Sequence, residues 1–90
     1  MAERITDLSK PKLSGKARLR YDDVRQIDVL LLPERVVRLN RSAAAILSLC
    51  DGQHTVSEIA RELEGRYQCS ELVSDVLEFL HSAYDQRWVV

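Results

Sequence analysis

The side chains best suited to metal binding or nucleophilic catalysis are two cysteines and two histidines, namely Cys50, Cys69, His54 and His81. Zinc sites in small proteins usually contain closely spaced pairs such as Cys-x-x-Cys or His-x-x-x-His, and these residues form no such pair. A Cys–His nucleophile also needs a pocket and oxyanion donors, which the sequence does not indicate. We therefore interpret both cysteines as buried apolar groups and both histidines as surface residues, and expect no metal site.

Phosphate binding and acid–base catalysis are not indicated either. A phosphate-binding loop clusters its glycines, whereas Gly15, Gly52 and Gly65 are far apart in this chain. Most carboxylates fall on the faces of predicted helices, where they act as solvated charges. With 90 residues, the chain can form one domain with a modest core and no deep catalytic cavity. The sequence thus predicts a protein without enzymatic activity and without a cofactor.

Charge is unevenly distributed along the chain, although the net charge is only −1. Residues 1–20 contain six basic and two acidic residues, whereas residues 21–90 contain seven and twelve. We interpret residues 1–15 as a flexible N-terminal tail and residues 16–90 as a single domain. No apolar segment approaches the roughly 18–20 residues of a membrane span. The first residues lack the apolar core of a signal peptide, so we predict a cytoplasmic protein.

Alternating apolar and polar residues predict three β-strands in the first half of the chain. The strands are expected over residues 17–22, 24–32 and 35–39. Asp22-Asp23 and Pro33-Glu34 are suited to the two turns, because Asp favours turn backbone and Pro fixes its own φ. The three strands then form an antiparallel meander, and the last of them has one side without a partner strand.

Capping residues and helix-forming segments predict three helices in the second half. Asn40 can accept hydrogen bonds from the first amides of a helix over residues 41–49. Residues 55–58, Thr-Val-Ser-Glu, form a capping box, and Ser70 is placed to cap a third helix that ends near Asp85. The second helix runs from residue 56 to about 65–67, and residues 87–90 form a short extended segment against the domain. Three strands followed by three short helices indicate an α+β, winged-helix-like fold.

The third predicted helix carries more apolar residues than one buried face requires. One stripe consists of Leu72, Val76, Phe79 and Ala83, and the other of Val73, Leu77, Leu80 and Tyr84. Two interpretations remain open. Either the helix is central and buried on most sides, or one stripe lines a groove beside the open strand edge, where an extended peptide can add as a further strand.

The same helix argues against binding of nucleic acid. A winged helix that reads DNA usually places Arg or Lys on its third helix to contact phosphates and bases. Residues 70–86 contain four acidic residues and neither Lys nor Arg. These carboxylates would repel the phosphate backbone, so a DNA-binding regulator is the least favoured alternative.

Several segments, in this order, resemble the PqqD family of peptide chaperones in pyrroloquinoline quinone biosynthesis. They are Arg18-Leu-Arg-Tyr-Asp-Asp-Val-Arg, Val29-Leu-Leu-Leu-Pro-Glu-Arg-Val, Leu39-Asn40 and Ala44-Ala-Ile-Leu-Ser-Leu-Cys-Asp-Gly-Gln-His-Thr-Val-Ser-Glu-Ile. The resemblance spans about residues 11–90. It implies a protein that binds the ribosomally made precursor peptide PqqA and presents it to the radical S-adenosylmethionine enzyme PqqE.

The resemblance also implies the position of the binding site. In this family the precursor adds as a strand to the third β-strand and packs against the third helix. The corresponding residues here are Arg35, Val36, Val37, Arg38 and Leu39 on the strand, and Leu72, Val76, Phe79, Leu80 and Ala83 on the helix. An adaptor of the same fold in another peptide-modifying pathway remains an alternative. We expect a monomer or a weak homodimer, because an open strand edge can pair two copies.

Overall fold

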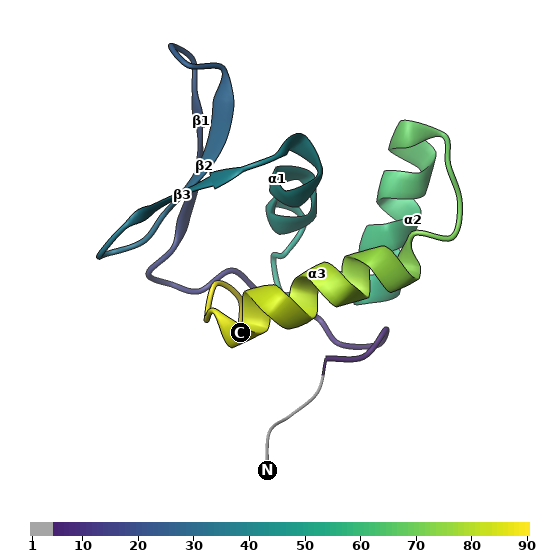
Figure 1. Cartoon of the computed structure of the whole chain (residues 1–90). Helices are drawn as coiled ribbons and strands as arrows, with labels where there is room; N and C mark the ends of the chain where they lie inside the picture. The colour runs from purple at the N-terminus through teal and green to yellow at the C-terminus, as the bar shows by residue number, and fades with distance from the viewer. Residues whose placement is uncertain (1–4) are drawn as a thin grey trace.

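The structure is a computed structural model, and it describes residues 5–90. Three β-strands precede three α-helices along the chain (Figure 1). The elements are β1 (Arg18–Asp22), β2 (Ile27–Leu31), β3 (Val36–Leu39), α1 (Arg41–Ser48), α2 (Val56–Tyr67) and α3 (Val73–Asp85). The α+β, winged-helix-like fold predicted from the sequence is confirmed, with a three-stranded antiparallel sheet followed by three helices.

The sheet has the order β1-β2-β3, with β2 paired antiparallel to both neighbours. The turn between β1 and β2 is longer than the predicted Asp22-Asp23 turn, because residues 23–26 all lie outside the strands. The Asp22 carboxylate accepts hydrogen bonds from the amides of Val24 (3.0 Å) and Arg25 (3.2 Å), and Gln26 has a φ of 58°. The side-chain bonds of Asp22 thus fix a four-residue turn, and β2 begins at Ile27 rather than Val24.

Two of the three predicted helix caps are confirmed. Asn40 Oδ1 accepts a hydrogen bond from the Ala43 amide (2.7 Å). Thr55 and Glu58 form the reciprocal capping box at the start of α2. The predicted cap at Ser70 is wrong, since α3 begins at Val73 and has no side-chain cap. Instead, the Leu72 amide donates to the carboxylate of Glu64 in α2 (2.9 Å), so that a long-range bond replaces a local one.

The core lies between the sheet and the helices and includes buried residues from every element except β1, whose partly buried Leu19 packs against it. One face of the sheet packs on α1, and α3 packs on α2. Figure 1 shows α3 passing below β3 and α1, with its C-terminal end toward the turn between β2 and β3. The largest fully buried side chains are Leu30, Leu47, Ile59, Leu80, Val56, Val76 and Val89. None of the helices in residues 5–90 has the length and apolar character needed to cross a bilayer.

The prediction that residues 1–15 form a tail outside the domain is wrong for residues 5–15. Ile5 belongs to the hydrophobic core, and Leu13 pairs with Val89 near the C-terminus. The backbones of Lys12 and Val90 exchange two hydrogen bonds, of 3.1 and 2.7 Å. Such isolated bridges have no sequence periodicity that a strand prediction could detect. Residues 1–4 lie outside the described part of the chain.

Candidate functional site

Strand β3 is an edge strand whose second side pairs with nothing in residues 5–90. The Leu32 amide donates to the Arg35 carbonyl (2.9 Å), and the register pairs Leu30 with Val37. In an antiparallel ladder, hydrogen-bonded and non-bonded pairs alternate. The main-chain groups of Val37 therefore point toward β2, whereas those of Val36 and Arg38 point away from the sheet. These two residues supply the main-chain donors and acceptors of the open edge.

The side chains of β3 alternate between the two faces of the sheet. Val37 and Leu39 face the core, and Leu39 is buried. Val36 is 61% exposed on the opposite face, together with Arg38. Arg35 precedes the strand, and its guanidinium donates to the side-chain carbonyl of Gln86 just after α3 (3.2 Å). This bond holds the start of β3 near the C-terminal end of α3.

The predicted residues of α3 divide into a buried set and a surface set. Leu80 and Ala83 are completely buried, and Val76 is 2% exposed. Leu72 and Phe79 are half-buried against the core. Leu80 and Ala83 were predicted as binding residues, and this prediction needs correction because they have no surface that a ligand can touch. The side chains of Leu72 and Phe79 are the ones that remain accessible.

A hollow of about 420 Å³ lies beside Leu72 and Phe79, at the end of β3 where α1 begins. Its walls come from α1, the end of α2, the connection to α3, and α3 itself. The lining residues are Asn40, Ser42, Ala43, Ile46, Leu63, Tyr67, Cys69, Leu72, Asp75, Val76 and Phe79. Most of these side chains are apolar, and Asp75 is the one carboxylate among them. The structure thus places α3 in the core and exposes part of it to a hollow, while the use of this hollow by a peptide stays a prediction.

The two cysteines differ in their surroundings. Cys50 is buried, and burial raises the pKa of its thiol to about 12 because the thiolate loses its solvation. Cys69 lies in the connection between α2 and α3, is exposed, and lines the hollow. The prediction of two buried cysteines is therefore correct for Cys50 and wrong for Cys69. Within residues 5–90, no three His, Cys, Asp or Glu side chains come together as possible metal ligands.

Tyr67 and Ile46 line the hollow but were not among the predicted site residues. They come from α2 and α1, and the sequence offers no signal for them because their position depends on how the helices pack. Asn40 did carry a signal. As the N-cap of α1, it fixes the point at which the chain leaves the strand edge and enters the helix beside the hollow.

Comparisons with known proteins identify the family of this chain. The family model of coenzyme PQQ synthesis protein D (PqqD) matches residues 29–89. A protein of Methylococcus capsulatus named PqqA binding protein is 42% identical over 78 residues, which make up 87% of this chain and 84% of that protein. A bifunctional coenzyme PQQ synthesis protein C/D of Methylorubrum extorquens is 40% identical over 79 residues, but only 21% of that longer protein is covered.

The solution NMR structure of the PqqD part of Methylobacterium extorquens PqqCD is similar in fold, with a TM-score of 0.82 and 36% identity. The similarity covers 96% of this chain and 94% of that one. That protein is described as a functional, stand-alone recognition element for ribosomally synthesized and post-translationally modified peptides. The family match and the relative at 42% identity show that the chain belongs to the PqqD family.

Proposed function

We propose that this chain is a non-catalytic peptide chaperone, which binds the precursor peptide PqqA as an additional strand on β3 and presents it to PqqE. The observation that carries the proposal is the open edge at Val36 and Arg38, together with an apolar hollow at the end of β3 where α1 begins. Its relatives support a binding role, because one is named for binding PqqA and another is described as a recognition element.

Strand addition accounts for both parts of the site. The amides and carbonyls of Val36 and Arg38 can form main-chain hydrogen bonds with any extended peptide, so they provide affinity without sequence selectivity. Every second side chain of the added strand would then point toward the helical side of the sheet. Apolar side chains at those positions would pack against Phe79 and Leu72, and this packing provides selectivity.

Charge gives the peptide a preferred composition. Arg35 and Arg38 are exposed at the open edge, whereas Asp75 lies at the hollow. An acidic segment along the edge, followed by an apolar anchor at the hollow, fits this distribution. Complementary charge mainly speeds the encounter and fixes the register of the peptide, while the apolar anchor determines how slowly it leaves.

The cytoplasm is the compartment that we propose for this step. The peptides recognised by the similar M. extorquens domain are ribosomally synthesized. Cys50 and Cys69 are both free thiols, as is usual in a reducing compartment.

Titration of the labelled protein with PqqA, followed by NMR, tests the proposed site. We expect the largest amide shifts at Val36 and Arg38, with further shifts at Leu72 and Phe79. Leu19 and Tyr21 in β1 serve as the internal control, because they lie on the other edge of the sheet. Shifts confined to β1 would overturn the proposed site, and the absence of any shift at saturating peptide would overturn the proposed function.

A further inference from the structure

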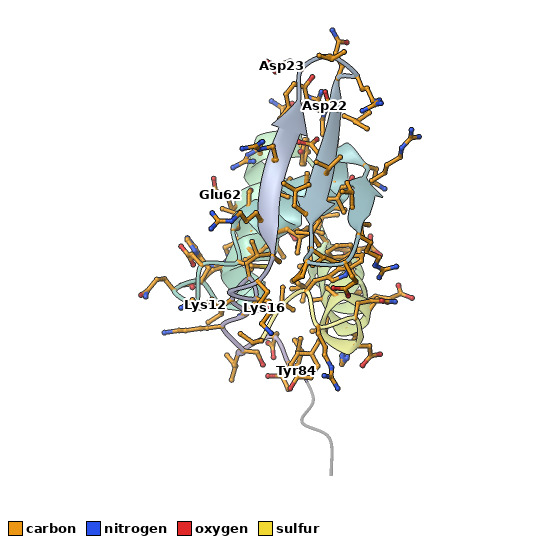
Figure 2. The ribbon with its side chains drawn as sticks, turned by 90° about the vertical axis from the view of Figure 1, so that its left-hand side faces the viewer. Lys12, Lys16, Asp22, Asp23, Glu62 and Tyr84 are labelled. Atoms are coloured by element: carbon orange, nitrogen blue, oxygen red, sulfur yellow. The ribbon has the colours of Figure 1, made fainter. Side chains whose placement is uncertain are left out.

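The face of the sheet opposite the helices carries an apolar strip between arginines. Figure 2 looks onto this outer face, with the helices behind the sheet. The register aligns Arg18, Leu31 and Val36 in one row across the three strands, and Arg20, Val29 and Arg38 in the next. The central strand thus contributes Ile27, Val29 and Leu31 to the apolar strip, and the edge strands contribute Arg18, Arg20, Val36 and Arg38 beside it.

This outer face is hollowed and partly apolar. A hollow of about 590 Å³ extends from Leu31 and Val36 to the turn between β1 and β2. Val29 is only 8% exposed although no helix covers this face, which we attribute to the aliphatic stems of Arg20 and Arg38 on either side of it. Val24, in the turn at the top of the sheet, is 92% exposed. Clustered exposed apolar groups with a polar rim are typical of protein interfaces.

The arginines of the outer face form no salt bridge within residues 5–90. Within residues 5–90, the salt bridges of arginine are those of Arg25 with Asp22 and of Arg66 with Glu62. Arg18, Arg20 and Arg38 therefore have no carboxylate partner in that part of the chain. A complementary surface would place carboxylates around an apolar centre.

These features favour a protein partner over the other candidates. A second copy of this chain would bring the arginines of two outer faces together, and like charges oppose such pairing. Nucleic acid would satisfy the arginines but would leave Ile27 and Leu31 without apolar contacts. A protein with an acidic rim around an apolar patch satisfies both parts of the surface.

We propose that the outer face of the sheet is a docking surface for PqqE, through an acidic-rimmed apolar patch on that enzyme. This inference rests on the proposed function, since it takes PqqE as the enzyme that receives the peptide. A strand added beside β3 would continue the same sheet, so its alternate side chains would join the outer face. An enzyme docked there would lie directly over the bound peptide.

Charge reversal on β1 separates docking from peptide binding. Arg18 and Arg20 lie on the strand farthest from the open β3 edge. We therefore compare Arg20→Glu and the double variant Arg18→Glu/Arg20→Glu with Arg61→Glu, which changes the same charge on an exposed position of α2. The affinities for PqqE and for PqqA are measured separately by calorimetry, after circular dichroism has confirmed that each variant is folded. Should a β1 variant unfold, Arg20→Gln, which removes the charge without reversing it, is measured in its place.

We expect Arg20→Glu to weaken binding of PqqE by roughly tenfold and the double variant to weaken it further. Arg61→Glu should bind PqqE within about twofold of the wild type, and all variants should retain their affinity for PqqA. Wild-type affinity for PqqE in a folded double variant would overturn the inference alone. A wild-type dimer that Arg20→Glu dissociates would also overturn it, by assigning the surface to a second copy. Failure of the wild type to bind PqqE would overturn both this surface and the presentation step, whereas failure to bind PqqA would overturn the proposed function.

Discussion

The two edges of the sheet pair with no further strand in residues 5–90, and they differ in their surroundings. The hydrogen-bond alternation that turns Val36 and Arg38 outward on β3 also turns Leu19 and Tyr21 outward on β1. Beside β3, the hollow is lined mostly by apolar groups such as Phe79. Beside β1, a hollow of about 540 Å³ is lined by apolar groups such as Leu19 and Ala44 and also by the charged side chains of Asp28, Arg41 and Arg66.

From this difference we expect that unpaired main-chain groups do not make a peptide site by themselves. Any extended chain can bond to either edge, and such bonds exchange for bonds to water with a small net gain. Burial of apolar side chains next to the new strand supplies the remaining affinity and the selectivity. We expect α3, rather than the edge itself, to distinguish β3 from β1.

Proline substitutions should have the largest effect on the difference in PqqA binding between the β3 and β1 edges. Arg38→Pro removes an outward amide without removing a bond to β2, and an edge strand can accommodate this change. We expect PqqA binding to weaken by roughly 1–3 kcal/mol, from the lost bond and from the ring that obstructs the peptide. Leu19→Pro is the corresponding change on the β1 edge; because Leu19 packs against the core, it should lower stability, but the folded variant should keep its affinity for PqqA. Calorimetry with both variants checks this expectation.

The choice of position matters in this experiment. Val37 lies between the two outward residues, but its amide points toward β2, so Val37→Pro would damage the sheet instead of testing the edge. Equal losses for Arg38→Pro and Leu19→Pro, with both proteins folded, would show that the two edges are equivalent. The contrast between them would then be wrong.

Truncation of the α3 wall should have the next largest effect. Phe79→Ala removes accessible apolar surface beside the β3 edge, and we expect it to weaken PqqA binding by roughly 1–2 kcal/mol. Leu80→Ala is the control for the buried side of the same helix. It should lower the free energy of unfolding by about 2–5 kcal/mol, while the folded fraction keeps its affinity. Urea unfolding and peptide titration distinguish the two outcomes, and a normal affinity of Phe79→Ala would remove the hollow from the site.

The sequence predicted the elements better than it predicted their contacts. Alternation and caps are local signals, so the strands, Asn40 and the capping box at Thr55 were identified correctly. The turn at Asp22 and the start of α3 depend on side-chain bonds that a hydrophobic pattern does not record. For α3 this bond spans eight residues, from the Leu72 amide to Glu64.

The candidate site was predictable in outline for the same reason. A last strand in a meander has an open side, which places the edge at β3, but the direction of each amide depends on the register of the turn. Two apolar stripes on one helix cannot reveal which stripe faces the core. The family resemblance assigned Leu80 and Ala83 to the site by position, but both are buried, and they come from different stripes. Cys69 was assigned to the core because a free cysteine is usually buried, whereas it is exposed here.

Alkylation of Cys69 should have a smaller effect, and one confined to the β3 side. A maleimide reacts with this exposed thiol, whereas burial and the raised pKa of the Cys50 thiol keep Cys50 unmodified. Because Cys69 lines the hollow, a bulky adduct should weaken PqqA binding by about three- to tenfold. Cys69→Ser, treated with the same reagent, is the control. Unchanged binding by the fully labelled wild type would show that the peptide does not reach this end of the hollow.

The smallest predicted effect is a pH dependence of the protein's stability, which should not change the difference in peptide binding between the two edges. The Asp51 carboxylate bonds to His54 Nδ1 (2.9 Å), which raises the pKa of the imidazole above its usual 6.5. A raised pKa in the folded state stabilises the protein below pH 6.5, and this contribution is lost as the pH rises through the folded-state pKa. Both side chains are partly exposed, so the change in stability should be small.

Thermal unfolding of the wild type at pH 6 and pH 8 measures this contribution, and His54→Gln is the control because it cannot ionise. We expect a slightly higher midpoint at pH 6 for the wild type only. His54 lines neither the hollow beside β3 nor the hollow beside β1. The affinity of Arg38→Pro relative to Leu19→Pro should therefore be the same at both pH values. The ratio of these two affinities could instead change with pH in the wild-type background but not in the His54→Gln background. Protonation of His54 would then affect peptide binding at the β3 edge, and the two edges would differ in more than their side-chain surroundings.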